Sequence, residues 1–76
     1  MALFVILNGQ DRTFEDLAAT AQLDEVIQCM ELKADRVAVE HNGVIAPRTS
    51  WAEVQVKTGD RLEIVHFVGG GLGKNV

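Results

Sequence analysis

The chain has 76 residues, 47% of them hydrophobic, and a formal net charge of −4, which predicts one small acidic domain with a single core. The seven lysines and arginines are scattered along the sequence, which disfavours binding to nucleic acid. The single cysteine excludes an intrachain disulfide, and the longest apolar run, residues 2–7, is far short of the ~20 residues that cross a bilayer. We therefore expect a cytoplasmic protein with no nucleic-acid or membrane partner.

The first predicted unit is a β-hairpin. Residues 2–7 are dense in strand-forming side chains and end at Asn8-Gly9, a strong two-residue hairpin signal. Residues 10–14 then form the returning strand. The polar, alanine-rich residues 15–22 fit either a loop or the start of a helix, and the sequence leaves both open.

The hydrophobic period changes at residue 23. Leu23, Val26, Ile27 and Met30 recur at i, i+3, i+4 and i+7, which predicts an amphipathic helix. Thr20 is the expected cap of this helix, because threonine side chains accept hydrogen bonds from the first helical N–H groups.

The second half of the chain predicts more strands. Residues 36–40 alternate as a half-buried strand, Asn42-Gly43 marks a turn, and residues 44–46 run on to Pro47. Residues 49–54 read as a short helical turn, and residues 61–68 as the last strand. A hairpin, a crossing helix and a final strand parallel to the first give an α+β fold of the β-grasp (ubiquitin-like) type, with a mixed sheet of four to five strands and one main helix on one face.

Four stretches, in this order, carry a resemblance to a known family: residues 36–43 (RVAVEHNG), 47–53 (PRTSWAE), 59–65 (GDRLEIV) and 66–71 (HFVGGG). Together they resemble the ThiS family, the sulfur carriers of thiamine biosynthesis. The resemblance implies a ubiquitin-like domain, residues 1–68, and a flexible glycine-rich tail, residues 69–76. It also implies that the protein is a co-substrate rather than an enzyme, with no cofactor of its own.

In that family the terminal glycine carboxylate is adenylated with ATP by an E1-like adenylating enzyme and becomes a thiocarboxylate that donates sulfur. The partners implied are that enzyme, a cysteine-desulfurase-type sulfur source and an acceptor such as thiazole synthase. By this resemblance Gly71 and Gly70 are the reactive end, and Gly69 is part of the arm. Glycine suits such an arm because it has no Cβ to clash in a narrow channel.

Five residues, 72–76, follow the glycines and depart from the family pattern. We expect a protease to trim the chain after Gly71, although cleavage after Gly70 stays open. Some similar sulfur carriers, in homocysteine or siderophore routes, are made as precursors that are trimmed in this way. The sulfur acceptor therefore also stays open. Two other interpretations stay open. The chain could be the small subunit of a molybdopterin-synthase-type complex, or a β-grasp interaction module or modifier without sulfur transfer.

Strand parity predicts an uncovered apolar face. If Leu3, Val5 and Leu7 face the helix, then Phe4 and Ile6 face outward, and in the last strand Val65 and Phe67 do the same. We expect Phe4, Ile6, Val65 and Phe67 to form one partner-docking patch at the base of the arm.

The remaining chemically interesting side chains predict structural roles. Cys29 is expected to be a small packing residue, and Trp51 to pack under the edge of the sheet. His41 and His66 have no neighbours at metal-ligand spacing, so no metal site and no catalytic residue are predicted.

Overall fold

The structure is a computed structural model that describes residues 2–67 and 73–75. Its elements follow the chain as β1 Leu3–Leu7, β2 Gln10–Phe14, β3 Thr20–Gln22, α1 Leu23–Cys29, the 3-10 turn η1 Ala34–Arg36, β4 Val37–His41, β5 Val44–Ile45, the 3-10 turn η2 Arg48–Ser50, β6 Gln55–Lys57, β7 Arg61–Phe67 and β8 Gly73–Asn75.

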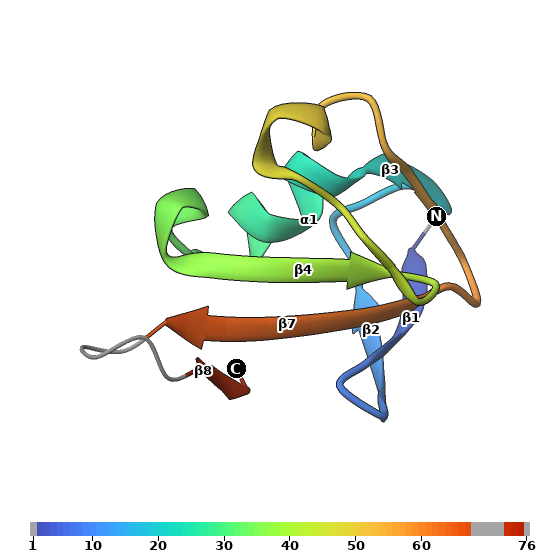
Figure 1. Ribbon diagram of the computed structural model, residues 1–76. Helices are drawn as coiled ribbons and strands as arrows, with labels where there is room; N and C mark the ends of the chain where they lie inside the picture. The colour runs from blue at the N-terminus through green and yellow to red at the C-terminus, as the bar shows by residue number, and fades with distance from the viewer. Residues whose placement is uncertain (1, 68–72, 76) are drawn as a thin grey trace.

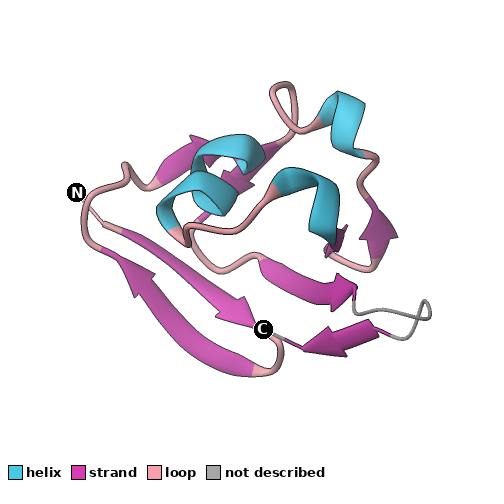
Figure 2. Cartoon of the chain, turned by 90° about the vertical axis from the view of Figure 1, so that its left-hand side faces the viewer, coloured by secondary structure: helices cyan, strands magenta, loops and turns pink. Residues whose placement is uncertain are grey.

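The main sheet has the strand order β2-β1-β7-β4-β5, and β8 adds to β7 (Figure 1). The first and last long strands, β1 and β7, are parallel, while β2, β4, β5 and β8 are antiparallel to their neighbours. Figure 2 shows the helical segments gathered on one side of this sheet. The mixed sheet with one helix on one face is therefore confirmed.

Both predicted Asn-Gly turns are present. Asn8 and Gly9 have φ values of 49° and 83°, and Asn42 and Gly43 have 52° and 83°. Two successive positive φ angles define the tight hairpin turn whose twist matches the flanking strands. These turns set the register of the β1–β2 and β4–β5 hairpins.

The core lies between α1 and the covered face of the sheet. Burial alternates along β1, so that Leu3 and Val5 are buried while the residues between them are only half-buried. Helix α1 contributes Val26 and Ile27 to the same cluster. Trp51 is 3% exposed, and its Nε1 donates a 2.8 Å hydrogen bond to the carbonyl oxygen of Ala46. Its predicted packing role is confirmed.

Two local predictions are wrong. Thr20 does not cap the helix, because it lies in β3, which pairs with β6 in a separate two-stranded sheet. The cap residue is Gln22, whose backbone nitrogen donates a hydrogen bond to Glu25 Oε1 at 2.9 Å. Cys29 is exposed at the end of α1 and is not a packing residue.

Candidate functional site

The predicted reactive end, Gly70 and Gly71, and the arm residue Gly69 lie outside the described residues. Their described neighbours are Phe67, the last residue of β7, and Gly73, the first residue of β8. The site is therefore defined by the strand from which the glycines extend and by the sheet face around its end.

β7 is the central strand of the sheet, with β1 on one edge and β4 on the other. Leu62 and Ile64 are 1% and 0% exposed, so the first half of the strand that leads to the arm is anchored in the core. Burying side chains of this size contributes about 1.5–3 kcal/mol each. The arm thus begins on one of the best-anchored elements of the fold.

Two polar contacts fasten the start of β7. The Asp60 carboxylate accepts hydrogen bonds from His41 Nε2 at 2.7 Å and from the Lys57 amide nitrogen at 2.9 Å. Partial burial raises the pKa of Asp60, but the hydrogen bonds from Lys57, His41 and Asn42 outweigh it and hold that pKa below its ordinary value. The charged carboxylate therefore ties the turn before β7 to the end of β4.

Where β1 ends, the side chain of Asn8 continues the hydrogen bonding along this edge of β7. Its Oδ1 accepts a hydrogen bond from the Ile64 amide nitrogen at 2.8 Å, and its Nδ2 donates to the Ile64 carbonyl oxygen at 3.2 Å. A side-chain amide here replaces the peptide unit of a longer β1 strand. The backbone of Ile64 is satisfied on this edge without another strand residue.

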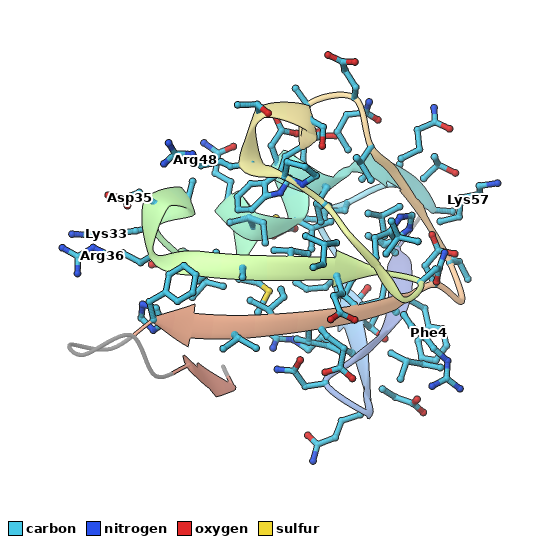
Figure 3. All side chains as sticks on the ribbon, viewed as in Figure 1. Phe4, Lys33, Asp35, Arg36, Arg48 and Lys57 are labelled. Atoms are coloured by element: carbon cyan, nitrogen blue, oxygen red, sulfur yellow. The ribbon has the colours of Figure 1, made fainter. Side chains whose placement is uncertain are left out.

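The sheet register separates the four residues predicted to form the docking patch. Ile6 lies beside Arg61, and the carbonyl oxygen of Phe4 accepts a 2.7 Å hydrogen bond from Gly59, just before β7 begins. Val65 and Phe67 lie at the other end of the strand. Figure 3 shows Phe4 near the start of β7, far from the end where the arm begins. The outward parity holds, but the structure does not bring the four together.

Different residues accompany Val65 on the outer face. Val65 is paired with Ala38 across the sheet, and both line a hollow of about 110 Å³ together with Ile45. Ile45 is 71% exposed and Phe67 is 47% exposed. We call Ala38, Ile45, Val65 and Phe67 the outer apolar patch. Ala38 and Ile45 were missed, although the outward parity of residues 36–40 already pointed to Ala38.

Charged side chains surround the outer apolar patch. Glu40 and Glu63 are directly paired on β4 and β7, so two carboxylates stand side by side on the uncovered face. At the end of the molecule where β7 ends, Figure 3 shows Lys33 and Arg36 projecting outward from the segment before β4. The apolar patch therefore has an acidic border on one side, and at the end of β7 lie two basic side chains together with Asp35.

The two histidines occupy different settings. His41 is bonded to Asp60, and His66 is half-buried on β7, paired with Val37 of β4. Within residues 2–67 and 73–75, no three His, Cys, Asp or Glu side chains gather as metal ligands. In that same part of the chain no helix is long and apolar enough to span a membrane.

Comparison with known proteins identifies the family to which this sheet and glycine run belong. The ThiS family model matches residues 5–71, and this match ends at the third glycine of the run. The chain belongs to the ThiS family. A crystal structure of the thiamine biosynthesis protein ThiS from Geobacter metallireducens superposes with a TM-score of 0.77 at 31% identity, over 91% of this chain and 100% of that one. This structural match supports the β-grasp assignment.

Sequence relatives are of two lengths. The sulfur carrier protein ThiS of Bacillus subtilis is 39% identical over 72 residues, covering 86% of this chain and 96% of that protein. A thiazole synthase of Paramagnetospirillum magneticum is also 39% identical, over 67 residues that cover 88% of this chain. The chain spans only 20% of the length of that thiazole synthase and 19% of that of a second one, from Magnetococcus marinus.

Proposed function

We propose that this ThiS-family chain is a sulfur carrier that delivers sulfur to the thiazole of thiamine. Its reactive group is the carboxylate of Gly71 after residues 72–76 have been removed. The observation that carries the proposal is the family match over residues 5–71, which includes the whole glycine run and nothing after it. The similarity to thiazole synthases supports thiazole synthase as the acceptor enzyme.

The chemistry explains why a main-chain carboxylate serves this purpose. A carboxylate is a poor electrophile, so a partner adenylating enzyme first joins it to AMP from ATP and releases pyrophosphate. Sulfide supplied by the sulfur source then attacks the carbonyl carbon, and AMP leaves with the electrons of the broken C–O bond. The resulting thiocarboxylate is a nucleophile tethered to a protein, which raises its effective concentration at the acceptor enzyme.

The described part of the chain supplies position and recognition. β7 anchors the arm through Leu62 and Ile64, and the outer apolar patch lies beside its end. An exposed apolar surface of this kind is typical of a protein interface. A partner that covers Val65 and Phe67 would receive the arm at a fixed place and direction. Docking and chemistry thus meet at the same end of the strand.

The residues after the glycines explain the need for trimming. Leu72, Lys74, Asn75 and Val76 bring side chains back into a segment that must pass through a channel fitted to glycine. We infer that a protease cuts after Gly71. Intact-mass measurement of the protein isolated from its native host tests this: a species ending at Gly71 is expected, and finding only chains that extend past Gly71 would contradict it.

The decisive experiment uses the chain ending at Gly71, incubated with the adenylating enzyme of the same host, ATP and sulfide. The expected result is a mass increase corresponding to the replacement of one oxygen atom by sulfur. The full chain ending at Val76 and a chain ending at Gly71 with Gly70→Val are the controls, and both should stay unmodified. Sulfur gain by the Gly70→Val chain, or none by the trimmed chain, would overturn the proposal.

A further inference from the structure

The tail contains a strand that the sequence pattern did not indicate. Strand β8 pairs antiparallel with the end of β7, with Val65 opposite Asn75, His66 opposite Lys74 and Phe67 opposite Gly73. Figure 1 shows β4 along one edge of β7 and β8 along the other. β8 therefore occupies the edge of β7 that β1 leaves uncovered.

The backbone hydrogen bonds of β7 indicate which of its residues has its N–H and C=O groups paired with β8. On the β1 edge, the carbonyl oxygens of Asp60 and Leu62 accept hydrogen bonds from β1 and its turn, and both backbone groups of Ile64 bind the Asn8 side chain. Backbone groups alternate between the two edges of a strand. His66 is therefore the next residue whose N–H and C=O point to this edge, and Lys74 lies directly opposite.

This pairing sets a geometric limit on the segment between the two strands. Directly opposed residues of antiparallel strands have Cα atoms about 4.5–5.5 Å apart. Phe67 and Gly73 are such a pair. An extended chain of the same length would separate its ends by about 20 Å. While β8 is paired, Phe67 and Gly73 therefore cannot separate as they would in an extended tail.

We propose that residues 73–75 form a masking strand that keeps the uncut chain from engaging its adenylating enzyme. The masking strand binds the edge of β7 at His66 through main-chain hydrogen bonds and holds Gly73 beside Phe67. Removal of residues 72–76 then has two effects: it creates the reactive carboxylate and it releases the arm. This inference rests on the proposed function and adds an inhibited state to it.

Amide hydrogen exchange measured by NMR tests the pairing itself. Lys74→Pro removes the N–H that faces His66, whereas the matched control Lys74→Gln removes the charge and keeps the N–H. The His66 amide should exchange slowly in the full chain and in Lys74→Gln. It should exchange about fivefold faster in Lys74→Pro and in the chain ending at Gly71, as expected for the loss of one backbone hydrogen bond. Equal exchange in all four proteins would overturn the proposal.

Binding to the adenylating enzyme without ATP tests the masking. The full chain with Lys74→Pro should bind about fivefold more tightly than the full chain with Lys74→Gln, although both have the same length. Equal affinity of the two variants would mean that the tail acts only by its bulk, and would overturn the masking strand. Neither measurement involves sulfur transfer, so failure of the trimmed chain to gain sulfur would count against the proposed function alone.

Discussion

The two halves of β7 have different surroundings. Residues 61–64 are flanked by β4 and its turn on one edge and by β1 and the Asn8 side chain on the other, with Leu62 and Ile64 fully buried and the start fastened by Asp60. Val65 and His66 pair with β4 on one edge, and residues 65–67 have only the three residues of β8 on the other. Val65 is half-buried and Phe67 is exposed. One continuous strand thus passes from the core to an open surface.

Under the proposed function, this difference shows how a small domain can hold a reactive arm. The buried half resists displacement because its contacts are apolar and internal. The exposed half keeps apolar side chains on its outer face, a feature that partner proteins bind, and its backbone edge opposite β4 is covered only by β8. Under the proposed function, stability and recognition are therefore located on successive residues of the same strand, and substitutions can separate them.

Ile64→Ala should have the largest effect on stability. Truncating a fully buried isoleucine removes apolar contacts and leaves a cavity, which costs about 2–5 kcal/mol. Urea unfolding of the variant and of the parent chain measures this free energy. The matched control is Val65→Ala, in the exposed half, which should cost clearly less. Equal losses at the two positions would contradict the division of β7 into two halves.

Asn8→Ala should have the next largest effect. The substitution leaves the Ile64 amide and carbonyl groups without their side-chain partner, which costs about 1–3 kcal/mol. Because Asn8 has a φ of 49°, alanine also strains the turn, so Asn8→Gly serves as the control that loses the amide without the strain. Thermal unfolding gives both losses. If Asn8→Gly were as stable as the parent chain, the side-chain amide would have no role in closing this edge.

Much of the fold follows from short-range signals. The two Asn-Gly turns, the alternating strands and the apolar stripe of α1 are local patterns, and each appears where the sequence placed it. The β3–β6 sheet was missed because its strands have three residues each, too few to show a clear period. Gln22 was missed as the helix cap because glutamine is not among the usual capping residues.

The functional site was harder to predict than the fold. Parity correctly turned Phe4 and Phe67 outward, but their separation along the sheet depends on the register of the parallel β1–β7 pair. A long crossover connects those strands, and no local pattern fixes their register. The masking strand was missed for a different reason. It pairs through its backbone, and Gly73-Lys74-Asn75 has none of the apolar alternation that indicates a strand.

Phe67→Glu in the chain ending at Gly71 should weaken binding to the adenylating enzyme about tenfold, because it places a charge in the outer apolar patch. Its stability should change by less than about 0.5 kcal/mol, since the side chain is exposed. Phe4→Glu, at the opposite end of the outer face, is the control and should bind nearly as the parent does. Calorimetric titration of the three proteins decides. Stronger loss from Phe4→Glu would move the docking surface to the start of β7.

Asp60→Asn tests the fastened start of β7 and should have the smallest effect, about 1 kcal/mol at neutral pH. The folded state holds the pKa of Asp60 below its ordinary value of 3.8, so the charged form stabilises the fold. That contribution is complete above this ordinary value and is lost as the pH falls through the lower folded pKa. Urea unfolding between pH 7 and pH 2 should therefore show the unfolding free energies of parent and variant converging only in the acidic range. The control Glu53→Gln, which replaces an exposed carboxylate, should follow the parent throughout.

Because Asp60 lies at the opposite end of β7 from the outer apolar patch, Asp60→Asn should leave enzyme affinity unchanged at neutral pH. A loss of affinity would mean that the start of the strand also sets the direction of the arm, and that the two halves are coupled.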